Sequence, residues 1–229
     1  MSVGFQKTGI VMANGETIKP NLATGTADFS GWTANQIFTT SKDEDGFTVK
    51  SAVSTGVTSN NWRRIVSPYL NYDDVSGGMV VSFMFKCDDY SALDHNVICA
   101  IQNYNSAYTR IGWIEPDLRT STNVYHDDLV DGKWINVVYY FTSGQIATCY
   151  SGYTGPVAKV NVTFNIVLNG SVHFKRPKIE TGTSPLQATP WIPNVNDWGY
   201  VGADHGYIEN GDLMKIYEKR IDTTEFIEY

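Results

Sequence analysis

Apolar and polar residues alternate with a period of two along several parts of the chain. The pattern is longest in 158–168, and shorter versions occupy 81–85 and 133–141. Because the side chains of a strand point alternately to opposite faces, such alternation is typical of half-buried β-strands. Similar residue types predict further strands at 46–53, 64–70, 96–103, 109–115, 145–151 and 171–175.

Turn-forming dipeptides separate these predicted strands. Asn169-Gly170 lies between two strand patterns and is the strongest hairpin signal, since both residues accept the positive φ of tight turns. Before residue 200 we find no apolar stripe of helical period. Parallel strands need crossover helices, so we expect antiparallel pairing and an all-β fold, a β-sandwich or barrel.

The pattern divides the chain into three regions. Residues 1–19 indicate a short strand or arm with a turn at Asn14-Gly15, and residues 20–193 hold the alternating strands of the sandwich. Residues 194–229 are charged and rich in turns. We interpret them as an attachment or oligomerisation segment; the alternative is an ordinary extension packed on the sandwich.

Composition narrows the classes of function. Hydrophobic residues make up 42% of the chain, enough for a large core. The net charge of −7 argues against nucleic acid as a partner, because phosphate binding depends on clustered lysine and arginine. The N-terminal residues lack a signal-peptide pattern, and no apolar run reaches the roughly 20 residues of a membrane span, so we expect no membrane insertion.

The three cysteines, Cys87, Cys99 and Cys149, match neither a disulfide framework nor a zinc motif. We expect buried free thiols that pack as small hydrophobic side chains. A Cys87–Cys99 bridge is the alternative if their two strands are neighbours.

Two motifs at the ends of the sandwich resemble a known family. The first is NLATGTADFSGW at 21–32, and the second combines PKIETGT at 177–183 with ATPWIPN at 188–194. This pair resembles the jelly-roll carbohydrate-binding modules in tail and baseplate proteins of phages and prophages of Gram-positive bacteria. The last residues, 217–229, are also similar to the ends of such tail proteins.

The resemblance implies an antiparallel β-sandwich of jelly-roll type whose first and last strands meet. It implies a non-catalytic virion protein of the tail or baseplate, made in the bacterial cytoplasm, that adheres to host cell-wall polysaccharide. The expected partners are that polysaccharide, other tail or baseplate proteins, and further copies of the chain in a homo-oligomer.

The resemblance also implies one structural calcium ion near the joined termini, with Asp28 and Glu180 as oxygen ligands. Carboxylate-rich loops at 41–46 and 87–90 are compatible with calcium chemistry as well. Neither loop has the regular spacing of a calcium-binding motif, so solvated charge is their ordinary explanation.

Sugar recognition needs aromatic rings, on which pyranose faces pack, and polar side chains that bond hydroxyl groups. One predicted hairpin, 102–113, contains both kinds of residue. The alternative is a tyrosine-rich hairpin that only packs and solvates. The candidate platforms are Tyr104, Tyr108 and Trp113, and the candidate hydrogen-bonding residues are Gln102, Asn103 and Arg110.

Two further clusters complete the candidate binding residues. One contains Trp62 and Arg63 after two asparagines, and the other begins with Tyr125. We hypothesise that both clusters and the hairpin line one sheet face. The remaining tryptophans are interpreted as structural: Trp32 and Trp191 as apolar caps over one end of the sandwich, and Trp134 as core.

Motifs for catalysis are missing from the sequence. We find no G-x-S-x-G elbow, no H-E-x-x-H zinc motif and no phosphate loop, so we expect the chain not to be an enzyme. Two alternatives to adhesion stay open. One is a purely structural tail component without a sugar site, and the other is a wall-degrading glycosidase or lyase, which would need a suitably spaced pair of carboxylates.

Overall fold

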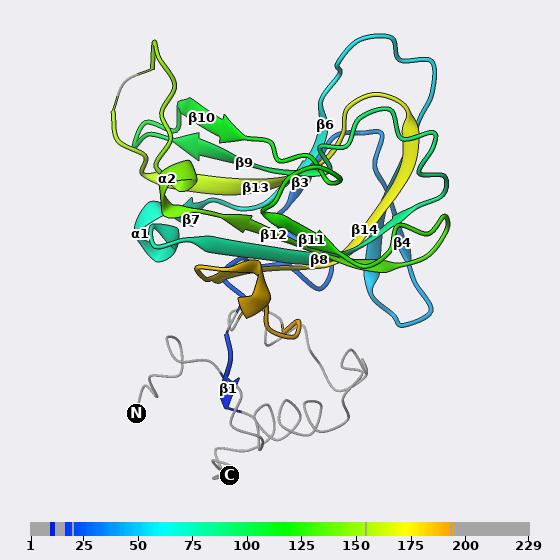
Figure 1. Cartoon of the computed structure of the whole chain (residues 1–229), viewed down its shortest axis with the longest axis horizontal. Coiled ribbons are helices and arrows are strands. Elements are labelled where there is room, and N and C mark those ends of the chain that lie inside the picture. The colour runs from blue at the N-terminus through cyan, green and yellow to red at the C-terminus, as the bar shows by residue number, and fades with distance from the viewer. Residues whose placement is uncertain (1–9, 12–16, 20, 154, 193, 195–229) are drawn as a thin grey trace.

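The protein is an antiparallel β-sandwich, seen in a computed structural model that describes residues 10–11, 17–19, 21–153, 155–192 and 194 (Figure 1). Two six-stranded sheets pack face to face, with the first sheet above the second in Figure 1. All strand pairs are antiparallel, which confirms the predicted fold class.

The first sheet has the strand order β10-β9-β13-β6-β3, with β7 also paired to β13. The second sheet has the order β11-β12-β8-β14-β5-β4. In the first sheet the strands are β3 (Thr33–Ala34), β6 (Arg63–Val66), β7 (Leu70–Asn71), β9 (Cys99–Tyr104), β10 (Arg110–Ile114) and β13 (Lys159–Ile166). In the second sheet they are β4 (Thr39–Lys42), β5 (Thr48–Ser54), β8 (Met79–Cys87), β11 (Val124–His126), β12 (Ile135–Phe141) and β14 (Gly170–Thr181).

Short elements complete the described part of the chain. None of its helices is long and apolar enough to cross a membrane. A separate two-stranded pair precedes the sandwich. The predicted turn at 14–15 and nearly all of 194–229 lie outside the described residues, so the division into arm, sandwich and C-terminal segment stays a prediction. These elements are β1 (Ile10–Val11), β2 (Thr17–Ile18), α1 (Tyr72–Val75), α2 (Ser143–Ile146) and the 3-10 helix η1 (Pro185–Gln187).

The core lies between the two sheets and is rich in aromatic rings. The Phe164 ring of the first sheet lies 4.6 Å from Phe83 and 5.2 Å from Phe174 of the second sheet, measured between ring centroids. Trp32 stacks on Phe164 at 5.7 Å, so it belongs to the core between the sheets rather than covering an end. The predicted half-buried strands therefore meet through the apolar positions of their alternation.

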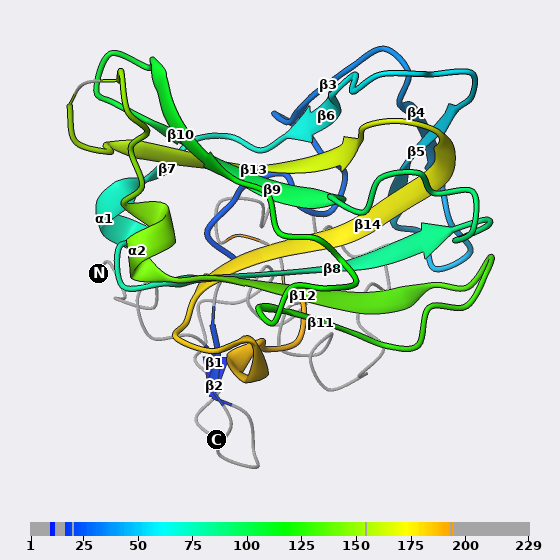
Figure 2. The same cartoon turned by 45° about the horizontal axis from the view of Figure 1, so that its top comes forward.

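The Asn169-Gly170 turn does not close a hairpin, contrary to the sequence prediction. It links β13 of the first sheet to β14 of the second, as the crossing of the yellow ribbon in Figure 2 shows. Gly170 has φ 142°, so the dipeptide does supply an unusual backbone conformation. The partner of each strand is decided by which sheet can bury its apolar face, and the local turn does not specify this.

Three other local predictions also need correction. The predicted strand 145–151 is instead α2 and the loop after it, because Thr142 and Gln145 form a capping box that starts a helix. The predicted strand 64–70 is split into β6 and β7 around Pro68, which has no amide for the ladder. All three cysteines are free, and Cys149 is exposed, whereas Cys87 and Cys99 are buried as expected.

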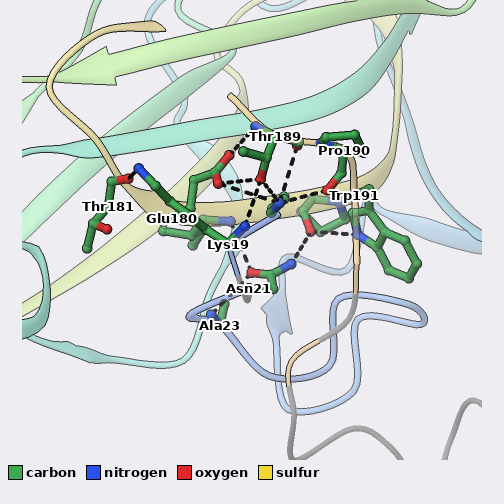
Figure 3. Close-up of polar contacts among 11 residues, drawn as sticks. Lys19, Asn21, Ala23, Glu180, Thr181, Thr189, Pro190 and Trp191 are labelled. Atoms are coloured by element: carbon green, nitrogen blue, oxygen red, sulfur yellow. Dashed lines mark hydrogen bonds and ion pairs between the residues drawn. The ribbon is translucent and has the colours of Figure 1, made fainter. Parts of the chain in front are cut away.

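The two ends of the sandwich meet, as the motif pair implied (Figure 3). Asn21 donates from Nδ2 to the carbonyl of Pro177 at 2.9 Å and accepts at Oδ1 from the amide of Ile179 at 3.0 Å. Asn194 donates to the carbonyls of Asn21 and Leu22 at 2.6 and 3.1 Å. These buried side-chain bonds satisfy backbone groups that the sheet leaves unpaired.

A buried ion pair lies at this closure. Lys178 and Glu180, both on β14, are almost inaccessible to solvent, and Lys178 Nζ lies 3.5 Å from Glu180 Oε2. Lys178 also donates to the carbonyl of Pro190 at 2.7 Å. Both carboxylate oxygens of Glu180 accept hydrogen bonds at 2.7 Å from Thr189, one from its amide and one from its hydroxyl (Figure 3). The segment that follows η1 is thereby fixed to the outer face of the second sheet.

We expect Gly25→Ala to lower the free energy of unfolding by about 1–3 kcal/mol. Gly25 has φ +66°, and an added Cβ would lie 1.8 Å from the carbonyl oxygen of Ser30. Gly56→Ala is the matched control, because Gly56 has φ +70° but no atom within 4 Å of an added Cβ. Urea unfolding of both variants measures the difference; equal losses would show that the contact with Ser30 contributes nothing.

Candidate functional site

The candidate site is the outer face of the first sheet, here called the first-sheet face. The apolar side chains of β13 belong to the core between the sheets. Since side chains alternate along a strand, Lys159, Asn161, Thr163 and Asn165 point the other way, to the outer face.

Cross-strand register shows which neighbours share this face. Asn161 is opposite Gln102, and Gln102 is opposite Trp113. One row further along, Lys159 is opposite Tyr104, and Tyr104 is opposite Arg110. Directly opposite residues of an antiparallel pair point to the same side of the sheet. By the same rule Arg64, opposite Asn165, completes the set on β6.

Exposed tyrosines surround one end of the first-sheet face. Tyr69 follows β6, and Tyr108 lies in the β9–β10 turn with 56% of its surface exposed. Their rings lie 5.1 Å apart, and Tyr69 is also 5.1 Å from Tyr104. Tyr150 and Tyr153, in the loop after α2, are exposed as well. Rings held against one another in this way can offer apolar surface to a ligand at little entropic cost.

The loop after α2 is fixed against β10. Asn103 Nδ2 donates to the carbonyls of Gln145 and Thr148, both at 3.1 Å. Gly112 permits this approach, because a Cβ there would lie 2.2 Å from the Thr148 oxygen. The Tyr150 hydroxyl donates to the Trp113 carbonyl at 2.7 Å, so the loop places Tyr150 beside Trp113.

Both tryptophans of this region carry an arginine over the ring. The guanidinium carbon of Arg110 lies 5.1 Å from the Trp113 centroid, and that of Arg64 lies 4.8 Å from the Trp62 centroid. Such cation–π pairs hold the guanidinium close to the aromatic ring of the tryptophan. The first-sheet face therefore combines aromatic surface with two cationic donors.

Glu115 adds one carboxylate, directly after β10. Burial raises its pKa, while the positive charges of Arg64 and Arg110 act in the opposite direction. Burial also lowers the pKa of Arg64, with Arg110 adding to the decrease and Glu115 opposing it. These three charges therefore interact across the face, although Arg64 is on β6 at one side of β13 and Arg110 and Glu115 belong to the β10 side.

The floor of the first-sheet face has polar atoms without partners. Among the described residues, Asn161 Oδ1, Thr163 Oγ1 and both polar atoms of the Asn165 side chain are buried and make no hydrogen bond. Buried polar groups are nearly always bonded, so a row of exceptions on one strand calls for an explanation. A row of amide and hydroxyl groups of this kind matches the hydroxyls of a sugar chain.

The structure brings most of the sequence candidates together. Tyr104, Tyr108, Arg110 and Trp113 share the β9–β10 hairpin, and the predicted hairpin is confirmed. Trp62 joins them through Arg64 on the same face. Their role in sugar binding stays a prediction.

Three candidates lie elsewhere. Arg63 points between the sheets, where it donates to Ser54 Oγ at 2.6 Å and to the Leu168 carbonyl at 2.7 Å. Asn103 is fully buried beneath the loop after α2. Tyr125 is on β11, the edge strand of the second sheet. The hypothesis of one shared face therefore fails for the Tyr125 cluster, because β11 pairs with β12.

Sequence reasoning missed several residues of the face. Tyr150 and Tyr153 were obscured by the strand predicted at 145–151. Arg64 and Tyr69 lie within the predicted strand 64–70, and the sequence did not show which face of the sheet their side chains would join. The polar positions of β13 could be recognised in the sequence, but the pattern did not predict that their side chains are buried. The missed residues are Arg64, Tyr69, Glu115, Tyr150, Tyr153, Asn161, Thr163 and Asn165.

The implied calcium ligands do not fit a metal at Glu180. Its carboxylate is bonded by Thr189 and faces the Lys178 ammonium, so a divalent cation would meet a positive charge there. Asp28 Oδ1 accepts from the Ser30 amide at 2.8 Å within its own loop. Across the described ranges no group of three or more acidic, histidine or cysteine side chains is arranged to hold a metal. A structural calcium stays a prediction without assigned ligands.

The outer face of the second sheet is occupied by the chain's own charges. Trp134 is half-buried there and not in the core, which corrects the sequence interpretation; Lys175 Nζ lies 4.5 Å from its ring centroid. Lys175 also pairs with Asp43 and Asp45, which fixes the β4–β5 turn. Trp191 packs edge-on against Phe47 at 5.0 Å. These groups are used in holding the fold together.

Comparison with known proteins gives only structural neighbours. No family model matches the chain, and no curated protein matches its sequence. A CBM22-1 xylan-binding domain from Paenibacillus barcinonensis is 11% identical, covers 78% of this chain and 99% of its own, and has a TM-score of 0.41.

Two further neighbours have similar scores. A putative sugar binding protein from Bacteroides thetaiotaomicron is 12% identical, with 71% of this chain and 100% of its own covered and a TM-score of 0.41. The enzymatically active domain of tailspike protein 4 from bacteriophage CBA120 is 11% identical over 70% of this chain, with a TM-score of 0.42, and this chain spans 21% of its length. The neighbours thus include carbohydrate-binding modules and one phage tailspike, all at low identity.

Proposed function

We propose that this protein is a non-catalytic module that binds polysaccharide on its first-sheet face. The observation that carries the proposal is the row of buried, unpartnered polar atoms on β13, flanked by exposed tyrosines and two tryptophans. Sugar rings need both an aromatic surface and a set of donors and acceptors. The exposed tyrosines offer the aromatic surface, and the polar groups lie on the neighbouring strand β13 but are buried in the free protein, so a ligand would have to displace the side chains that cover them.

The finer proposal is a phage tail or baseplate protein that adheres to the host cell wall. It is supported by the resemblance of the end motifs 21–32 and 177–194 to those of such tail proteins. The position of the described ends is compatible with it: β1 and η1 lie below the second sheet, opposite the first-sheet face (Figure 1). Attachment through that side would leave the face free for a glycan. A shallow site binds weakly, so several copies in a homo-oligomer would add avidity.

We expect Tyr108→Ala to weaken binding to purified cell-wall polysaccharide about tenfold, because the ring is an exposed part of the proposed platform. Tyr125→Ala is the matched control: Tyr125 is 48% exposed but lies on the second sheet. Affinity electrophoresis of both variants and of Trp113→Ala measures the effect. Equal affinities for the two tyrosine variants would remove the first-sheet face from binding, and release of reducing ends would show a hydrolase instead.

A further inference from the structure

Two guanidinium groups of the first-sheet face have no oxygen partner among the described residues. Arg64 and Arg110 donate no hydrogen bond and form no ion pair there; they contact the tryptophan rings and interact with more distant charges. Arg63 and Arg119 behave differently, since each donates to a protein oxygen at 2.6 Å. The arginines that stabilise the fold are thus distinct from the two on the face.

The charge of the face differs in sign from that of the whole chain. The net charge of the chain is −7, yet Arg64 and Arg110 interact here with one carboxylate, Glu115, and Lys159 adds a third positive charge to the same face. Glu115 interacts with both arginines without an ion pair to either. One carboxylate cannot neutralise two guanidinium groups, so an anion from outside would be attracted.

The position of Arg64 makes it a suitable anion-binding group. Its strand, β6, lies on one side of β13, whereas Arg110, Glu115 and Tyr104, with which it interacts, come from β10 and β9 on the other side. The charges that act on Arg64 therefore come from across β13. A guanidinium presents a rigid fork of donors that matches carboxylate and phosphate oxygens in pairs, and stacking on Trp62 limits its freedom before binding.

We propose that the polysaccharide bound by the first-sheet face is anionic, and that Arg64 and Arg110 hold its carboxylate or phosphate groups. The inference rests on the proposed function and names the ligand class of the same site. Arg64 is directly opposite Asn165, so an anion bound by Arg64 would lie close to the unpartnered polar atoms of Asn165, which are buried in the free protein. Charge recognition and hydroxyl recognition would then involve neighbouring groups.

The experiment measures the affinity of the full chain for four polymers at low and high salt. Polygalacturonate carries carboxylates, poly(glycerol phosphate) carries phosphates, and xylan and dextran are neutral. The variants are Arg64→Gln, Arg110→Gln and Arg64→Lys. The control is Lys133→Gln, which removes an exposed positive charge close to β12 of the second sheet. Thermal unfolding of each variant checks that the fold is intact.

We expect one anionic polymer to bind at least about tenfold more tightly than the neutral ones, and each Arg→Gln variant to lose about tenfold. Which anionic polymer binds distinguishes carboxylate from phosphate. Arg64→Lys keeps the charge but loses paired donors, so partial loss is expected. Lys133→Gln should bind like the parent.

Two results would overturn the inference while the proposed function survives. One is equal or tighter binding of a neutral polymer with no salt dependence. The other is anionic binding that both Arg→Gln variants retain. Failure to bind any of the four polymers at any salt concentration would count against the proposed function and the inference together.

Discussion

Lys178→Met is expected to lower the free energy of unfolding by about 3–5 kcal/mol, because it removes the donor to the carbonyls of Thr189 and Pro190 and the partner of the Glu180 carboxylate. Lys178 is 0% exposed, and its ammonium also donates to carbonyls of the segment after η1. The loss would therefore affect both the charge balance and the closure of the two ends. Chemical unfolding at neutral pH measures it.

The double variant Lys178→Met/Glu180→Gln separates charge from hydrogen bonding. A glutamine keeps an oxygen that can accept from the Thr189 amide, which Glu180 now binds at 2.7 Å, but it carries no charge. We expect the double variant to recover part of the loss, since it removes the unpaired carboxylate charge but does not restore the donor to the Thr189 and Pro190 carbonyls. A double variant no more stable than Lys178→Met would show that charge is not the cause.

The same pair predicts a pH dependence. Burial lowers the pKa of Lys178 to about 8, with Glu180 opposing the decrease. The unfolded chain thus binds a proton at this lysine more tightly than the folded protein does. Between about pH 8 and the ordinary lysine value of 10.5, the contribution of Lys178 to stability should rise with pH. The stability difference between parent and Lys178→Met should grow over this range; a constant difference would contradict the assigned pKa.

Phe164→Ala is expected to cost about 3–5 kcal/mol, the usual range for a large cavity in a core. Phe164 is fully buried on β13, and its ring contacts Trp32 from the first motif as well as Phe83 and Phe174 of the opposite sheet. A cavity there would weaken contact between both sheets. Calorimetry or urea unfolding measures the change.

Tyr108→Ala serves as the reference for this variant. Its side chain is exposed at a turn, so we expect a change within about 0.5 kcal/mol. Phe164→Leu should lie between the two, because it keeps most of the apolar volume. A loss for Phe164→Ala no greater than that for Tyr108→Ala would show that the sheets do not depend on this contact.

The candidate site could be predicted from the sequence only where its residues are close along the chain. The β9–β10 hairpin brings Tyr104, Tyr108 and Trp113 together by local pairing, and a turn with aromatic residues on both sides is visible in the sequence. Arg64 and Tyr150 reach the same face from distant segments. Their position on this face depends on the order of strands in the sheet, and no local sequence pattern specifies that order. The prediction for Tyr125 was wrong for the same reason, because the strand order places β11 in the second sheet.

The alternation in the sequence predicted most of the strands and the antiparallel class, and the resemblance of the two end motifs implied that the ends of the sandwich meet. Alternation with a period of two is a local consequence of strand geometry, and it can be read without knowing any partner. The turn at Asn169-Gly170 was equally local, since its residues accept unusual backbone angles.

The sheet that each strand joins, and the polar residues that become buried, depend on packing between distant parts of the chain. β13 and β14 are adjacent in the chain but belong to opposite sheets. Lys178 and Asn165 occupy polar positions of the alternation, yet both are buried, one beneath the segment after η1 and the other on the proposed binding face. Burial depends on what covers a side chain from elsewhere in the sequence, and the free energy that selects this cover is a property of the whole packed sandwich.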